Sequence, residues 1–148
     1  MIFVTGGAGF IGSNFVLDWL ADPAAEPVVN LDALTYAGNR ANLASLEGDA
    51  RHHLVHGDIG DRALVDALLA EHRPRAIVNF AAQSEVAPSW KHPEHWFETN
   101  VVALSKFIKA LKDRDYFERY VHLTSPVLTS KACRKPPPLL HFDGSPPI

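Results

Sequence analysis

A regular alternation of short apolar runs with segments of helical periodicity constrains the fold of this chain more than any other feature. Five runs rich in β-branched side chains predict buried strands, at 2–5, 28–32, 53–56, 76–80 and 120–124. Apolar residues spaced three and four apart predict helices at 10–20, 62–72 and 94–112, and residues 39–47 predict an indistinct, helix-like connection. Strands that alternate with helices pair in parallel, so we expect an α/β, doubly wound parallel sheet.

Proline marks a boundary near Ser125. Of the eleven prolines, six lie in the last 23 residues, at Pro126, Pro136, Pro137, Pro138, Pro146 and Pro147. Residues 126–148 show neither the strand nor the helix period. We therefore expect one domain over 1–125 and an irregular, Pro-rich tail over 126–148.

Composition excludes several classes of protein. Fourteen basic against seventeen acidic residues give a net charge of −3, which disfavours a nucleic-acid partner. A single cysteine, Cys133, excludes an intramolecular disulfide and a thiolate-rich zinc site, and the histidines complete no metal-ligand pattern. No apolar stretch approaches the roughly 18 residues of a membrane span, and no basic leader precedes the first strand. We therefore expect a cytoplasmic chain with no metal and no membrane contact.

The loop after the first predicted strand carries the strongest chemical signal. It contains Gly6, Gly9 and Gly12 and opens directly into a helix. Gly6 permits a tight turn, Gly9 lets the backbone approach a pyrophosphate, and Gly12 lets the helix lie close to the sheet. The phosphates would lie on free N–H groups at the positive end of that helix. A purely structural turn is the alternative, whereas no Gly-Lys-Ser/Thr follows that would indicate a nucleoside-triphosphatase loop.

Residues at the ends of the next strands extend this dinucleotide hypothesis. Asp32 ends the second strand, 20 residues after Gly12, where a carboxylate can accept hydrogen bonds from the adenosine ribose and repel a 2′-phosphate. That favours NAD over NADP. Asp58 can reach the adenine amine or serve as a turn residue, and Ala81 can support the nicotinamide ribose or simply pack. Together these features predict a Rossmann-like domain.

Several strings resemble a known family. The string Thr-Gly-Gly-Ala-Gly-Phe-Ile-Gly-Ser at 5–13 is similar to the opening of the extended short-chain dehydrogenase/reductases. The string Asn-Leu-Asp-Ala-Leu-Thr-Tyr-Ala-Gly-Asn at 30–39 resembles the dTDP-glucose 4,6-dehydratases of the NAD-dependent epimerase/dehydratase family. Residues 56–59, 79–84, 99–101 and 120–124 match that family in order and spacing. The resemblance covers residues 1 to about 125.

The resemblance implies an activity and a set of contacts. In that family, bound NAD takes hydride from the sugar C4, water leaves across C5 and C6, and hydride returns to C6. The substrate would be dTDP-glucose and the assembly a homodimer. Cofactor contacts would be Gly6, Gly9, Phe10, Ile11, Gly12, Asp32, Thr35, Asp58, Ile59, Ala81 and Thr99. Ser84 would lie on the sugar side, and Ser125 stands at the position of a family threonine in the catalytic region.

The chain departs from the family pattern where catalysis requires an acid and a base. Pro126 and Val127 replace the family's Asp-Glu pair, and no Tyr-x-x-x-Lys occurs in the 148 residues. The family's sixth strand and substrate domain have no counterpart. We therefore expect a sheet truncated after about five strands, and the NAD-binding portion of a dehydratase that is inactive as an isolated chain. A non-catalytic dinucleotide-binding or interaction module, or a related sugar-nucleotide epimerase, are the alternatives.

Overall fold

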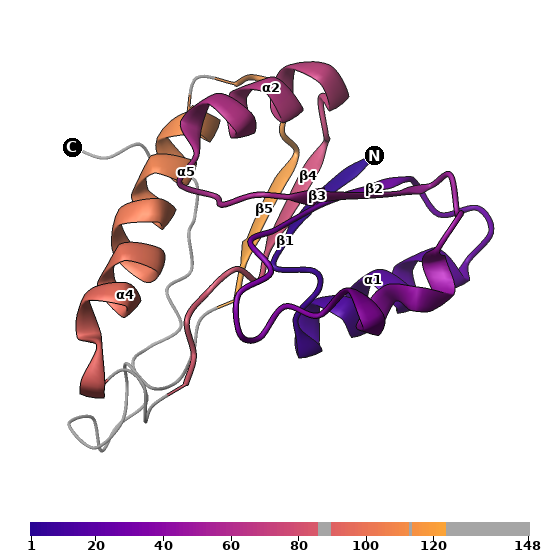
Figure 1. Ribbon diagram of the computed structural model, residues 1–148. Coiled ribbons are helices and arrows are strands. Elements are labelled where there is room, and N and C mark those ends of the chain that lie inside the picture. Colours follow the sequence, from indigo (N-terminus) through magenta and orange to yellow (C-terminus); the bar gives the residue numbers. More distant parts are fainter. Residues whose placement is uncertain (86–89, 113, 124–148) are drawn as a thin grey trace, which may run out of the picture.

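The computed structural model describes residues 1–85, 90–112 and 114–123, and in them one parallel sheet carries the fold (Figure 1). Its strand order is β3-β2-β1-β4-β5. The strands are β1 (Ile2–Thr5), β2 (Val28–Asp32), β3 (His52–His56), β4 (Ala76–Asn79) and β5 (Arg119–His122). The chain builds outward from β1 to β3, then returns to place β4 on the other side of β1. The predicted doubly wound α/β fold is confirmed, and its switch point lies between β1 and β4.

Helices cover both faces of the sheet, and alternate strand residues supply the two cores. The helix α1 (Phe10–Ala21) and the 3-10 helix η1 (Arg40–Leu46) cover one face. The helices α2 (Arg62–His72) and α5 (Leu104–Lys112) cover the other, where Phe3 stacks on Phe107 with ring centroids 6.2 Å apart. Val4, one position on from Phe3, packs toward α1. This alternation is the two-residue period of a strand buried on both faces.

Local signals in the sequence fix helix α2. The Asp61 carboxylate accepts a hydrogen bond from the Leu64 N–H at 3.1 Å, which caps the first turn. The helix ends at His72, because Arg73 takes a left-handed conformation (φ 42°) directly before Pro74. The predicted bounds of this helix are confirmed, and Val65 and Leu69 are fully buried as expected of its inner face.

The helix predicted over 94–112 is real but not uniform. It begins with α4 (Pro93–Phe97), widens into a π-helical segment, η2 (Glu98–Ala103), and continues as α5. A π turn contains one residue more than an α turn, and such segments are frequent at functional sites. No described helix is long and apolar enough to span a membrane. Ser125, Cys133 and the Pro-rich segment 126–148 lie outside the described residues, so the boundary near Ser125 stays a prediction.

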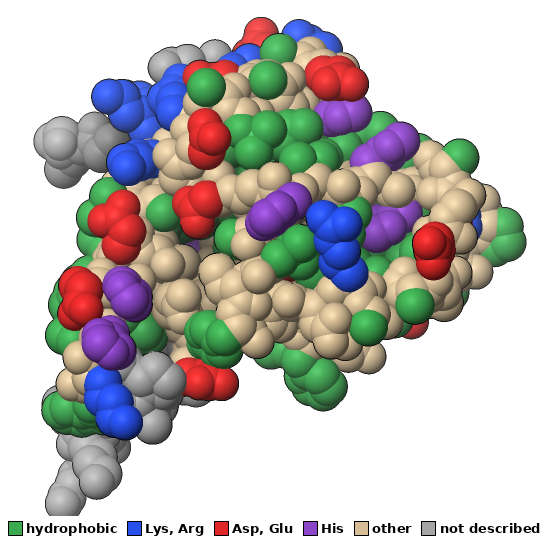
Figure 2. All heavy atoms as spheres, in the orientation of Figure 1, with side chains coloured by type: hydrophobic (Ala, Val, Ile, Leu, Met, Phe, Trp, Pro, Cys, Tyr) green, Lys and Arg blue, Asp and Glu red, His purple; other side chains and the backbone are tan. Residues whose placement is uncertain are grey.

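Strand β3 forms one edge of the sheet and contributes three histidines. Figure 2 shows histidine side chains on the surface over this strand. Side chains alternate along a strand, so the rings of His52 and His53 lie on opposite faces of the sheet. His53 stacks on His72 of α2 with centroids 5.9 Å apart, whereas His52 approaches Asn30 on the α1 side. Among the described residues, no group of three or more histidine, cysteine or acidic side chains could hold a metal ion.

Candidate functional site

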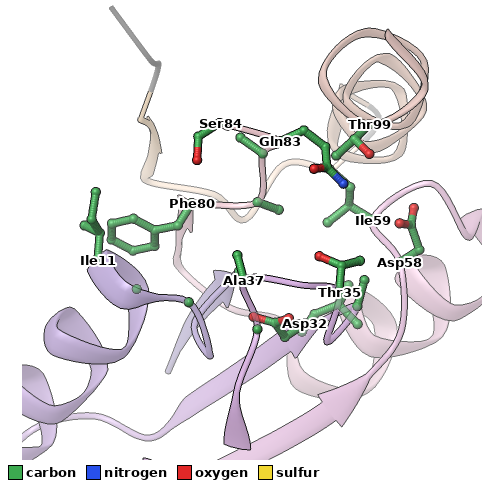
Figure 3. Close-up of a pocket in the computed structure, with 18 of the residues that line it drawn as sticks. Ile11, Asp32, Thr35, Ala37, Asp58, Ile59, Phe80, Gln83, Ser84 and Thr99 are labelled. Atoms are coloured by element: carbon green, nitrogen blue, oxygen red, sulfur yellow. The ribbon is translucent and has the colours of Figure 1, made fainter. Parts of the chain in front are cut away.

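A cavity of about 430 Å³ opens at the carboxyl ends of the strands, at the switch point of the sheet (Figure 3). That volume lies in the range of small-molecule sites. The cavity brings together all eleven residues predicted as cofactor contacts, together with Ser84, from segments up to about ninety positions apart in the chain. They are Gly6, Gly9, Phe10, Ile11, Gly12, Asp32, Thr35, Asp58, Ile59, Ala81 and Thr99. Ser125 lies outside the described residues.

The three glycines of the first loop meet different surroundings. Gly6 has φ +71°, and a Cβ there would lie 2.6 Å from the Ala81 nitrogen. A Cβ at Gly12 would overlap the Gly6 carbonyl oxygen and lie 2.8 Å from the Gly7 Cα. A Cβ at Gly9 would meet nothing closer than 3.4 Å, and Gly9 lines the cavity. The fold therefore requires glycine at positions 6 and 12, whereas at position 9 the missing side chain leaves space for a ligand.

The first turn of α1 offers unpaired donors to the cavity. Gly9 caps the helix without a side-chain hydrogen bond, and the Ser13 N–H donates to the Gly9 carbonyl at 2.9 Å. The N–H groups of Phe10, Ile11 and Gly12 precede that first intrahelical bond and line the cavity. The first turn carries no acidic residue that would compete with a ligand anion. This end of the helix therefore suits a phosphate group.

Asp32 ties the glycine loop to the segment after β2. Its carboxylate accepts the Ala8 N–H at 2.8 Å and the Leu34 N–H at 2.7 Å, and the residue is only 7% exposed. Leu34 itself takes a left-handed conformation with φ 51°. A carboxylate has about four lone-pair positions, so two remain for hydroxyl donors from the cavity. Asp32 can therefore hold the backbone and accept ribose hydroxyls at the same time.

The segment after β2 packs onto the glycine loop through one carbonyl group. The Ala8 carbonyl accepts the Asn39 N–H at 3.0 Å and the Asn42 side-chain amide at 2.9 Å. Because Asp32 accepts the Ala8 N–H, both backbone polar groups of Ala8 are engaged by residues between 32 and 42. Thr35 and Ala37 are thereby held at the cavity, where Figure 3 shows them beside Asp32.

A side-chain amide holds the segment after β4. Asn100 of the π-helical segment accepts the Gln83 N–H at 2.8 Å and donates to the Gln83 carbonyl at 2.9 Å. This pairing holds Gln83 against the π-helical segment, and Figure 3 shows Gln83 beside Thr99 at the edge of the cavity. No motif in the sequence predicts Asn100 as a site residue. The one available signal is an amide at the start of a largely apolar helical stretch.

Within residues 1–85, 90–112 and 114–123, the three tyrosine hydroxyls have hydrogen-bond partners other than lysine. The Tyr36 hydroxyl accepts the N–H groups of Ser84 and Glu85 at 3.4 Å. The Tyr116 hydroxyl donates to the Leu69 carbonyl at 2.8 Å. Tyr120 lies 3.3 Å from His122, and burial raises the pKa of Tyr120 to about 12. Tyr120 is therefore protonated at neutral pH.

A buried polar row lies under the cavity. The Thr5 hydroxyl donates to the Asn79 side-chain oxygen, and the Asn79 nitrogen lies 2.7 Å from Nδ1 of His122. Burial lowers the pKa of His122, which keeps its imidazole neutral and able to accept this bond. The row thus joins the ends of β1, β4 and β5. The ionisable side chains lining the cavity in the described part of the chain are Asp32 and Asp58, both hydrogen-bonded to backbone amides.

Comparison with known proteins adds an independent finding. The family model described as GDP-mannose 4,6 dehydratase matches residues 3–126. A dTDP-glucose 4,6-dehydratase of Xanthomonas campestris pv. campestris (strain B100) is 52% identical over 131 residues, covering 82% of this chain and 36% of the relative. The chain therefore spans little more than a third of that relative.

Two solved structures share the fold and contain bound cofactor. A DesIV double mutant of Streptomyces venezuelae, a dTDP-glucose 4,6-dehydratase with NAD and DAU bound, aligns with a TM-score of 0.78 at 43% identity. It covers 84% of this chain and 39% of its own. A UDP-glucose-4-epimerase of Stenotrophomonas maltophila with bound NAD aligns with a TM-score of 0.73 at 28% identity, over 84% and 36% of the two chains.

Proposed function

On the premise that the chain belongs to the GDP-mannose 4,6 dehydratase family, we propose that it is the NAD-binding portion of a dTDP-glucose 4,6-dehydratase. One observation carries the proposal: the eleven residues that sequence motifs assign to the cofactor line a single cavity at the switch point of the sheet. When bound, NAD supplies reversible hydride transfer with the sugar. The cytoplasmic location and the homodimer stay predictions.

The residues present fit a dinucleotide. The space beside Gly9 admits a diphosphate close to the backbone, and the N–H groups at the start of α1 donate to it. Asp32 accepts the adenosine ribose hydroxyls, and its charge opposes a 2′-phosphate. Asp58 lies where the adenine amine can donate to it. Ala81 offers a flat surface to the nicotinamide ribose, and Ser84 faces the sugar.

The residues that line the cavity can bind NAD but do not supply an acid and a base for proton transfer. The Tyr36 hydroxyl accepts the Ser84 N–H at the edge of the cavity, the Tyr116 hydroxyl donates to the Leu69 carbonyl, and both cavity carboxylates accept backbone amides. We therefore propose that the isolated 148-residue chain binds NAD without dehydrating dTDP-glucose. A non-catalytic dinucleotide-binding module is the second candidate, favoured by this missing acid–base pair. A sugar-nucleotide epimerase is less favoured, because identity to the dehydratases exceeds identity to the epimerase.

A calorimetric titration with NAD and NADP tests the cofactor role. We expect the parent chain to bind NAD at least about tenfold more tightly than NADP, a difference of about 1.4 kcal/mol. Asp32→Asn removes the charge and keeps only one of the two oxygens that accept backbone N–H groups, so it should weaken the binding of both cofactors and narrow the preference for NAD. Asp58→Asn is the matched control, because it removes a charge from the same cavity away from the ribose position. Asp58→Asn should weaken the binding of both cofactors and leave the ratio of the two Kd values unchanged.

Two outcomes contradict the proposal. Equal affinity of the parent chain for NAD and NADP would refute the ribose role of Asp32, and no binding of either at millimolar concentration would refute the dinucleotide site. Incubation of the chain with NAD and dTDP-glucose tests the proposed absence of turnover. Formation of the 4-keto-6-deoxy product would show that the chain contains catalytic groups that the proposal denies it.

A further inference from the structure

A buried side-chain amide links the glycine loop to a histidine two strands away. Asn30 of β2 is fully buried, and its Oδ1 accepts the Gly7 N–H at 3.1 Å. Its Nδ2 lies 3.4 Å from Nε2 of His52, at the start of β3. A Cβ at Gly7 would overlap this amide, so Asn30 packs directly against the loop backbone. The three residues form a continuous contact from the edge strand to the phosphate-binding turn.

The polarity of this contact depends on the charge of His52. An amide oxygen only accepts and an amide nitrogen only donates, so Nε2 of His52 must be the acceptor for Nδ2 of Asn30. Only a neutral imidazole protonated on Nδ1 can do this. A protonated imidazole presents N–H groups on both sides. Rotating the Asn30 amide would satisfy His52 but would turn its nitrogen toward the Gly7 N–H. With His52 protonated, Asn30 therefore cannot keep its contacts with both Gly7 and His52.

We propose that His52 is a positioning residue for the glycine loop: its neutral form holds the Gly7 amide through Asn30, and its protonation loosens the loop and weakens dinucleotide binding. The effect on the ligand rests on the proposed function, whereas the effect on the Gly7 amide rests on this contact alone. Neither His52 nor Asn30 lines the cavity, so both act through the backbone of the loop.

The groups around His52 favour the neutral form. Burial lowers the pKa of His52, the neighbouring His53 lowers it further, and Asp49 opposes them. Asp49 is itself paired with Arg51 at 2.8 Å, and Arg51 also donates to carbonyls at the end of α1. On this face strand β2 presents the apolar Val28 opposite His52, the neutral Asn30 beside it, and the carboxylate of Asp32 at the far end of the strand, opposite His56. His52 therefore takes up its proton below the ordinary histidine value of about 6.5.

Nuclear magnetic resonance on the full chain tests the contact without ligand. We expect the Gly7 amide signal to shift with the same midpoint as the His52 ring between pH 8 and 5. Loss of one hydrogen bond corresponds to roughly fivefold in affinity, so the Kd for NAD should rise about fivefold over the same interval. His52→Gln keeps an acceptor but cannot titrate, and should flatten both profiles. His53→Gln, one residue away on the opposite face, is the matched control: both profiles should keep their transition, with the midpoint moved upward because His53 no longer lowers the pKa of His52.

The two readouts separate this inference from the proposed function. A Gly7 signal that titrates with His52 in a chain that binds no NAD would uphold the contact and contradict the dinucleotide site. A chain that binds NAD but whose Gly7 signal does not change as His52 titrates would uphold the dinucleotide site and contradict the contact. If His52→Gln fails to fold, the titration of the parent chain still decides the matter. If a folded His52→Gln chain showed the same pH dependence of the Gly7 signal and of the Kd for NAD as the parent chain, the inference would be overturned.

Discussion

The glycine loop allows the demands of folding and of binding to be separated with two single-methyl changes. In Gly9→Ala the new Cβ would lie 3.4 Å from the Gly6 carbonyl oxygen and 3.8 Å from that of Ala37, both ordinary contacts. The backbone at Gly9 is extended (φ −74°, ψ 173°), which alanine adopts without strain. Alanine also restricts the unfolded chain, so unfolding should cost about the same or up to about 1 kcal/mol more.

Binding should respond in the opposite direction. The same methyl group would stand where the backbone makes its closest approach to the diphosphate. Forcing a methyl group into a filled site costs roughly 1–3 kcal/mol, so NAD should bind roughly 5- to 150-fold more weakly to Gly9→Ala.

Gly12→Ala is the matched variant, because its methyl group meets the protein instead of the ligand. The Cβ would overlap the Gly6 carbonyl oxygen, and backbone cannot move aside as a flexible side chain can. Unfolding should become easier by roughly 1–3 kcal/mol. For a chain of this length that lowers the Tm by roughly 2–12 °C.

Thermal unfolding and NAD titration of both variants show whether each glycine is needed by the fold or by the ligand. A Tm for Gly9→Ala as low as that for Gly12→Ala would show that the space beside Gly9 is needed by the fold. Parental NAD affinity in a folded Gly9→Ala chain would show that the diphosphate does not approach there.

Two further predictions concern stability. Asp61→Ala removes the cap of α2 and should lower the unfolding free energy by about 1 kcal/mol in a denaturant titration, whereas Asp61→Asn should restore it; equal values for the two variants would contradict the capping role. Burial lowers the pKa values of His52 and His122, so below about pH 6.5 the unfolded chain binds more protons than the folded one. The unfolding free energy should therefore fall between pH 7 and 5, and His122→Gln should reduce that slope; an unchanged slope would exclude His122 as a source.

Elements fixed by local chemistry were predictable from the sequence. The bounds of α2 follow from the Asp61 cap and from Pro74, which act within one turn of the helix. The ends of the strands were less predictable, because a strand ends where its neighbours in the sheet stop pairing with it. Strand β4 ends at Asn79, one residue before the end of the apolar run, although the Phe80 N–H still donates to the Thr5 carbonyl at 2.8 Å.

The π-helical segment could not be predicted, because the periodicity of apolar residues tolerates one extra residue in a turn. The residue that anchors it, Asn100, acts on Gln83, which lies 17 positions away and on another element. The contacts of Tyr36 with Ser84 and Glu85 are of the same kind. They depend on which side chains the folded sheet brings together, and neither composition nor spacing indicates them.

Motif spacing located the cavity for a different reason. Gly6, Gly9 and Gly12 belong to one turn, so their geometry is set within a few residues, and Asp32 ends the strand paired with β1. The register between β1 and β2 then places the carboxylate beside the loop, where it accepts the Ala8 N–H. The residues could be expected to lie together because parallel pairing of adjacent strands is itself predictable, whereas their role in binding NAD stays a prediction.

The glycine loop nevertheless does not determine its own shape. Three side chains hold its backbone: Asn30 at the Gly7 N–H, Asp32 at the Ala8 N–H, and Asn42 at the Ala8 carbonyl. All three come from β2 or from the segment that follows it. Glycines supply the freedom to turn, but this freedom allows many conformations, and the buried polar partners select the one that presents N–H groups to an anion. A glycine motif therefore predicts a phosphate site reliably only when the neighbouring strand supplies such partners, as the residues of β2 do here.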